Sequence, residues 1–156
     1  MKSIIPVLIL SIVILSCNDQ IRNDKDYVIF EASPKKENIQ FYWKNDSGKA
    51  IKNINGLKKY VESKNENLKF AMNGGMFEVN NIPKGLYIEN SKILNKIDTS
   101  TGNGNFYLQP NGVFYITKNH EPKIVETKKF GFNENTQFAT QSGPMLLING
   151  NINSIF

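Results

Sequence analysis

Cysteine, histidine and arginine each occur once in this chain, and these low counts argue against several classes of protein. With one cysteine, no disulfide can form within the chain. One histidine, His120, together with that cysteine gives no cluster of metal ligands and no visible Ser-His-Asp arrangement. A nucleic-acid-binding surface would carry clustered arginine and interleaved aromatic residues, whereas Arg22 is the only arginine. We therefore expect no metal centre and no nucleic-acid partner.

Long apolar runs are also scarce, with one exception at the amino terminus. After the short positive region of residues 1–3, residues 4–15 are almost wholly aliphatic, and Cys17 follows the small residue Ser16. A run of about a dozen residues is short for a membrane-spanning helix, which needs roughly 20. The pattern is similar to a bacterial lipoprotein signal peptide. We expect residues 1–16 to be removed and Cys17 to carry a lipid; a buried free cysteine is the alternative.

Removal of residues 1–16 would leave 156 − 16 = 140 residues, and the loss of Lys2 would lower the formal charge from +5 to +4. That length supports one domain with a hydrophobic core. Residues 17–26 are polar and predict a flexible tether, which places the domain over residues 27–156. The lysines are scattered and indicate solvated faces, although they would also favour an anionic ligand or an anionic lipid surface.

Segments rich in aromatic and β-branched residues predict an α+β domain, made mainly of antiparallel strands with one or two helices. Apolar residues at three- and four-residue steps predict one helix over residues 54–64, with Asn53 at its start. Hairpin turns are expected at Asn90-Ser91, at residues 109–112 and at Asn149-Gly150. The predicted strands are residues 27–30, 39–43, 68–72, 85–89, 92–94, 106–108, 113–116, 124–126, 145–148 and 151–153.

Three glycine-punctuated stretches stand where apolar runs pass into loops. They are Asn-Gly-Gly-Met-Phe at residues 73–77, Gly-Asn-Phe and Pro-Asn-Gly-Val-Phe within residues 104–114, and Gln-Ser-Gly-Pro-Met at residues 141–145. Glycine removes side-chain bulk, so that backbone N–H groups can approach a ligand closely. We expect the three stretches to form one polar pocket wall.

Together with Pro-Lys-Gly-Leu-Tyr at residues 83–87 and Ala-Thr-Gln-Ser-Gly-Pro-Met-Leu at residues 139–146, these stretches resemble the phosphodiester glycosidase family in order and spacing. The resemblance extends over residues 27–156 and implies hydrolysis of a sugar phosphodiester. Family members usually continue with an arginine- and glycine-bearing segment and a Leu-Asp-Gly stretch, and neither is in this sequence. We therefore expect a partial domain of this family.

The resemblance and the residue types select the candidate site residues. The candidate catalytic residues are Asn73, Gln141 and Ser142. The candidate substrate-binding residues are Gly74, Gly75, Lys84, Asn105 and Gly143. Purely structural roles remain the alternatives: a bulge at Asn73, a rigid turn at Gln141 and Ser142, and a solvated side chain at Lys84.

Carboxylates are few near these loops, although a glycosidase site usually uses them. Glu78 directly follows the first motif, and Asp98 precedes residues 99–104. They are the acidic residues closest in sequence to the motif loops, and a solvent-facing charge is the alternative for both. Asn111 occupies a turn, where asparagine is favoured for backbone reasons alone.

These features predict a lipid-anchored hydrolase of the bacterial cell envelope that cleaves a glycosyl phosphodiester without a cofactor. Its partners would be a glycosyl-phosphate or glycan substrate and, through Cys17, a membrane. Two alternatives stay open at this stage. One is a non-catalytic glycan- or phosphate-binding lipoprotein, and the other is an inactive, truncated gene product.

Overall fold

The computed structural model describes residues 22–23 and 28–156. The expected signal peptide, Cys17 and most of the expected tether lie outside the described residues. The chain divides into two units, residues 1–32 and residues 33–156. In the first unit, β1 (Arg22–Asn23) pairs antiparallel with β2 (Val28–Ile29), which falls within the strand predicted at residues 27–30.

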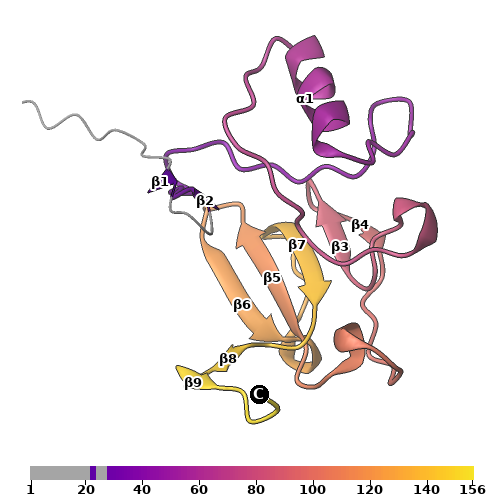
Figure 1. Ribbon diagram of the computed structural model, residues 1–156, viewed down its shortest axis with the longest axis vertical. Coiled ribbons are helices and arrows are strands. Elements are labelled where there is room, and N and C mark those ends of the chain that lie inside the picture. The colour runs from indigo at the N-terminus through magenta and orange to yellow at the C-terminus, as the bar shows by residue number, and fades with distance from the viewer. Residues whose placement is uncertain (1–21, 24–27) are drawn as a thin grey trace, which may run out of the picture. The chain divides into compact units, whose positions relative to one another are not determined.

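The second unit is organised around a five-stranded sheet with the order β4-β3-β7-β5-β6. Every neighbouring pair is antiparallel, and β7 lies at the centre (Figure 1). The strands are β3 (Tyr87–Glu89), β4 (Lys92–Asn95), β5 (Gly112–Thr117), β6 (Pro122–Glu126) and β7 (Thr136–Ser142). The predicted α+β, mainly antiparallel fold is therefore confirmed.

Alternation along the central strands separates the two faces of the sheet. On one face, Ile88 of β3, Val113 of β5 and Ala139 of β7 are fully buried and form a core cluster together with Leu86. Tyr115, Val125 and Phe130 pack against this cluster. Burial of large apolar side chains on a central strand is the main term that stabilises such a sheet.

The other face of the sheet is covered by residues that were predicted to form a strand. Residues 39–43 form no strand, and the ring of Phe41 instead stacks on Phe138 of β7, with the ring centroids 5.2 Å apart. Phe41 also stacks on Tyr87 and Phe114 at 6.3 Å. The prediction of a strand here was wrong because the aromatic side chains pack on the face of the five-stranded sheet, and the segment adds no strand to its edge.

The predicted helix is confirmed as α1 (Ile54–Ser63), the one α-helix among the described residues. The side chain of Asn53 accepts a hydrogen bond of 2.8 Å from the backbone N–H of Gly56, as expected for an N-cap. An edge-to-face contact between Tyr60 of α1 and Tyr42 connects the helix to the segment that covers the sheet. In the described part of the chain, no helix combines the length and apolarity that crossing a membrane requires.

Two of the three predicted hairpins are present. Asn90 and Ser91 turn β3 into β4, and Asn149 and Gly150 turn β8 (Leu147–Ile148) into β9 (Asn151–Ile152). The hairpin predicted over residues 106–116 was wrong, because residues 105–107 form a 3₁₀ turn, η2 (Asn105–Tyr107). β5 pairs instead with β6 and β7.

The strand predicted at residues 68–72 was also wrong, since these residues form no strand. Two further 3₁₀ turns, η1 (Val79–Asn81) and η3 (Thr127–Lys129), complete the elements of the second unit.

Candidate functional site

The motif loops meet at the carboxyl end of β7, around the buried side chain of Gln141. The Gln141 amide oxygen accepts hydrogen bonds of 3.0 Å from the backbone N–H groups of Leu86 and Asp98. The Gln141 amide nitrogen donates a bond of 2.6 Å to the carbonyl oxygen of Asp98. Since Gln141 is fully buried, these bonds offset the cost of removing its amide from water. Gln141 therefore joins β7 to the start of β3 and to the loop that carries Asp98.

Two glycines permit this close approach of backbone to side chains. Gly85 has a φ of +69°, and a Cβ there would overlap the Gln141 amide oxygen and lie 2.6 Å from Cζ of Phe106. A Cβ on Gly143 would lie 2.6 Å from the carbonyl oxygen of Phe106 and 2.8 Å from Cβ of Asn111. The loops that contain these residues are therefore packed together at distances that only glycine allows.

The first motif reaches the same end of the sheet. A Cβ on Gly75 would overlap the hydroxyl of Thr140 in β7. The backbone N–H of Lys84 donates a 2.9 Å hydrogen bond to the carbonyl oxygen of Met76, and Phe77 forms an isolated bridge with Pro83. Parts of all four motifs therefore lie at this end of the sheet, with Gly75 against Thr140 on the face of β7 opposite to Gln141.

Beside Gln141, five side chains form a polar group that we call the Lys84 cluster: Glu78, Lys84, Asp98, Ser100 and Tyr107. The ammonium of Lys84 pairs with the Glu78 carboxylate at 2.8 Å and lies 4.9 Å from the ring centroid of Tyr107. Asp98 accepts hydrogen bonds of 2.9 Å from the backbone N–H of Ser100 and 2.6 Å from its hydroxyl. The Lys84 side chain is only 21% exposed, so its charge is partly shielded from water.

Interactions within the cluster favour the charged forms of Asp98 and Lys84. The hydrogen bond from the Ser100 hydroxyl, followed by that from the Ser100 backbone, lowers the pKa of Asp98, and Lys84 and the Tyr107 hydroxyl act in the same direction. The hydrogen bond to Glu78 raises the pKa of Lys84, against the opposing effect of burial. At neutral pH, Asp98 is therefore an ionised carboxylate and Lys84 a protonated cation.

The remaining predicted site residues line the exposed edges of the same loops. Asn73, Gly74, Asn105 and Ser142 are exposed, and no Asn73 side-chain hydrogen bond is formed within the described residues. Ser142 ends β7 and pairs with Gly112 of β5. Asn111 is buried, and its amide donates to the carbonyl oxygen of Phe106 at 3.2 Å, which fits the structural role expected for it.

Two members of the Lys84 cluster were not among the sequence-based candidates, Tyr107 and Ser100. In the structure, a Cβ on Gly102 would lie 2.7 Å from the Tyr107 ring, a contact that no local sequence pattern indicates. Across residues 22–23 and 28–156, no three His, Cys, Asp or Glu side chains come together as metal ligands would.

The structure thus places glycine-containing loops near a lysine and a carboxylate at one end of an antiparallel sheet. Comparison with known proteins assigns the class: residues 66–156 match the family model described as phosphodiester glycosidase. The chain belongs to the phosphodiester glycosidase family.

A relative in Escherichia coli (strain K12), described as the uncharacterized protein YigE, is 36% identical over 124 residues. The matched region is 80% of this chain and 48% of the relative, so the chain spans about half the length of that protein. No solved structure gives a significant match to this chain.

Proposed function

We propose that this chain binds a glycosyl phosphodiester at the Lys84 cluster and takes part in hydrolysis of the bond between the sugar and the phosphate. The observation that carries the proposal is a protonated Lys84, paired with Glu78, whose charge also acts on the ionised Asp98 among loops held by Gln141. Membership of the phosphodiester glycosidase family supports the same chemistry.

The reaction develops positive charge on the sugar ring and negative charge on the departing phosphate. In our proposal, Lys84 binds the phosphate oxygens, and the substrate displaces the Glu78 carboxylate that Lys84 contacts in the free protein. The ionised Asp98 stabilises the charge on the sugar or accepts a proton from the attacking water. Because a phosphate ester is a good leaving group, no strong general acid is required, and an ionised Asp98 would not supply one.

The exposed amides and backbone groups of the loops would bind the sugar and phosphate oxygens. Asn73, Asn105 and Ser142 present polar side chains at the loop surface. Gly74, Gly75 and Gly143 contribute backbone without side-chain bulk. The Gln141 amide is occupied by its three backbone hydrogen bonds, so we assign it a positioning role within the proposed site.

We also propose that the protein works in the bacterial cell envelope, anchored through a lipid on Cys17. This proposal rests on the amino-terminal sequence, with its positive start, aliphatic run and cysteine after a small residue. A membrane anchor would keep the domain close to envelope glycans that carry phosphodiesters.

A non-catalytic binding protein is the second candidate. Both carboxylates of the Lys84 cluster are engaged within the protein, Glu78 by Lys84 and Asp98 by Ser100. A cluster of this kind can bind a sugar phosphate without turning it over.

The test uses the full chain and a nitrophenyl-linked sugar phosphodiester, with release of free sugar and binding measured separately. We expect Asn73→Ala to abolish turnover while Tm stays nearly unchanged, because the exposed Asn73 side chain contributes little to folding. We expect Lys84→Ala to raise KM at least tenfold and Asp98→Asn to lower kcat at least tenfold, about 1.4 kcal/mol each.

Lys123→Ala is the matched control, because Lys123 pairs with Glu121 at 3.0 Å and is not part of the Lys84 cluster. Binding that depends on Lys84 without any turnover would favour the non-catalytic candidate. Parallel losses of Tm and activity in Asn73→Ala would leave Asn73 with a structural role only.

A further inference from the structure

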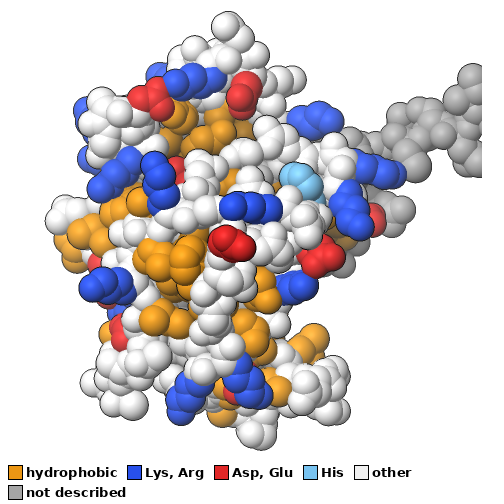
Figure 2. Space-filling model, turned by 180° about the vertical axis from the view of Figure 1, so that it is seen from behind, with side chains coloured by type: hydrophobic (Ala, Val, Ile, Leu, Met, Phe, Trp, Pro, Cys, Tyr) orange, Lys and Arg blue, Asp and Glu red, His pale blue; other side chains and the backbone are white. Residues whose placement is uncertain are grey.

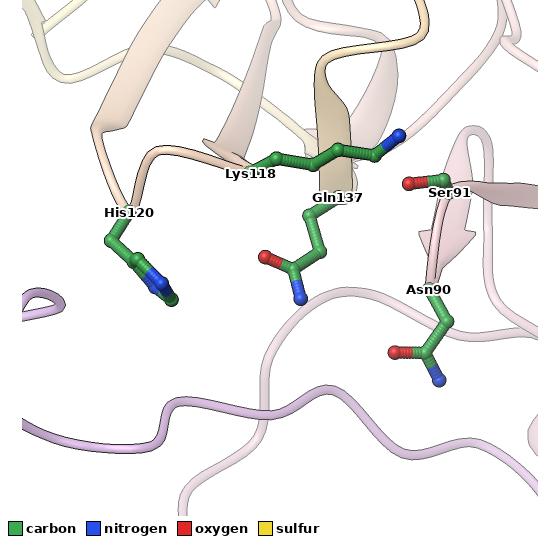
Figure 3. Close-up of a pocket in the computed structure, with 5 residues that line it drawn as sticks. All are labelled: Asn90, Ser91, Lys118, His120 and Gln137. Carbon is green, nitrogen blue, oxygen red and sulfur yellow. The ribbon is translucent and has the colours of Figure 1, made fainter.

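A second polar pocket lies at the other end of β7, away from the Lys84 cluster. It is an open pocket with a volume of about 330 Å³. Gln137 lies four residues before Gln141 in β7, a separation of about 13 Å along a strand at about 3.3 Å per residue. The pocket is lined by Asn90, Ser91, Lys118, His120 and Gln137 (Figure 3).

Three separate segments supply these residues, and their backbones are held in place by hydrogen bonds. Ser91 in the β3–β4 turn donates its N–H to the carbonyl oxygen of Gln137 at 2.8 Å. Lys118, after β5, donates its N–H to the carbonyl oxygen of Asn135 at 2.8 Å, and the N–H of His120 bonds to Thr117 at 2.9 Å. The pocket walls are therefore firmly connected to one another.

Local irregularities of the backbone coincide with the pocket. The register between β5 and β7 pairs Ile116 with Phe138 but Thr117 with Thr136, so Gln137 has no partner on β5. Such a bulge changes the direction of a side chain and is common beside functional sites. Ser91 has a φ of +61°, although glycine is favoured at this turn position. Strained residues of this kind are retained where a site needs them.

The side chains of the pocket are available to a ligand. Within the described residues, none of the five side chains forms a hydrogen bond or ion pair. Figure 3 shows the Gln137 amide between His120 and Asn90, with Lys118 extended toward Ser91. Figure 2 shows the imidazole of the single histidine at the surface, beside a basic side chain.

The lining selects the chemistry of the ligand. It offers a lysine ammonium, an imidazole, two amides and a hydroxyl, and it includes neither a carboxylate for a cation nor an apolar aromatic platform for a bare sugar. Its one cationic side chain, Lys118, is of a type that commonly binds phosphate as a point charge. The polar groups come from three separate segments of the chain.

We propose that this pocket binds a phosphate group, either free or carried on a sugar, at a site separate from the Lys84 cluster. The proposal does not depend on the proposed hydrolysis, because none of its residues belongs to that cluster.

The test is titration of the full chain with inorganic phosphate and, separately, with glucose 6-phosphate, followed by NMR of the backbone amides. We expect the largest shifts at Ser91, Lys118 and Gln137. Lys118→Ala should weaken phosphate binding at this site at least tenfold. Lys123→Ala removes the same charge from nearby strand β6 and should change it less than twofold.

Tighter binding of glucose 6-phosphate would assign the phosphate to a sugar ester, and equal binding would assign it to the free ion; either supports the proposal. Glucose without phosphate is the negative control, and equal shifts with it would overturn the ligand class. Three results would overturn the site itself. They are shifts confined to the Lys84 cluster, equal weakening of phosphate binding in both lysine variants, and no shifts with either phosphate ligand.

Discussion

At the scale of single residues, Gln141 shows how a buried amide organises loops that are distant in sequence. Its partners Leu86 and Asp98 lie 55 and 43 residues before it. The motif made Gln141 a site candidate, but no local pattern indicates which backbone groups it will contact. Those contacts depend on the order of strands in the sheet, and a wrong order would leave a buried amide without partners.

Gly85 provides a test of this packing. We predict that Gly85→Ala lowers the free energy of unfolding by roughly 2 to 5 kcal/mol. A left-handed backbone costs about 1–2 kcal/mol for alanine, and the overlap with Gln141 and Phe106 costs about 1–3 kcal/mol more. Urea denaturation of the full chain measures the change.

Gly48→Ala is the matched control for that experiment. Gly48 also has a positive φ, +79°, but nothing lies within 4 Å of a Cβ there. Gly48→Ala should therefore lose only the free energy that a left-handed backbone costs alanine. Equal losses of unfolding free energy in Gly85→Ala and Gly48→Ala would refute the packing argument.

At the scale of elements, the sequence predicted correctly one helix and two hairpin turns, whose patterns lie within short stretches of the chain. The three- and four-residue period located α1, and Asn90-Ser91 and Asn149-Gly150 marked two turns correctly. The strands predicted at residues 39–43, 68–72 and 106–108 are absent from the described structure. A segment rich in aromatic residues can form a strand or can pack without strand structure on the face of a sheet. Tertiary context decides which of the two occurs.

The cap of α1 yields a prediction at this scale. Asn53→Ala should lower the free energy of unfolding by about 1 kcal/mol, because the N–H of Gly56 loses its side-chain acceptor. Chemical denaturation measures the loss. Asn53→Ser is the control and should retain most of the stability, since serine is also a good N-cap; a loss equal to that of alanine would argue against capping.

At the scale of the whole molecule, the central strand β7 connects two polar regions, the Lys84 cluster beyond its carboxyl end and the second pocket near its start. Between them the sheet buries its core, while apolar side chains also reach the surface (Figure 2). Val79 and Met72 are among the most exposed, at 81% and 72%. Because the two regions that we propose as sites share no residues, we expect mutations in one to leave the other unchanged.

The anchor is the prediction that concerns the protein as a whole. We expect Cys17→Ser to leave an unprocessed precursor that is not labelled by radioactive palmitate, because we propose that the Cys17 thiol accepts the lipid. Gel mobility and labelling in a bacterial host measure both effects. Ser16→Ala is the control, since it keeps a small residue before the cysteine. Normal processing and labelling of Cys17→Ser would disprove the anchor.

The sequence by itself determined the local features: the period of α1, two hairpin turns and the family motifs. These depend on interactions between residues close along the chain, which any window of sequence contains. The tertiary structure alone decided that Lys84, Asp98 and Tyr107 form one cluster and that Asn90, His120 and Gln137 line one pocket. Such contacts join residues far apart in sequence, and they arise only when the strands take their places in the sheet.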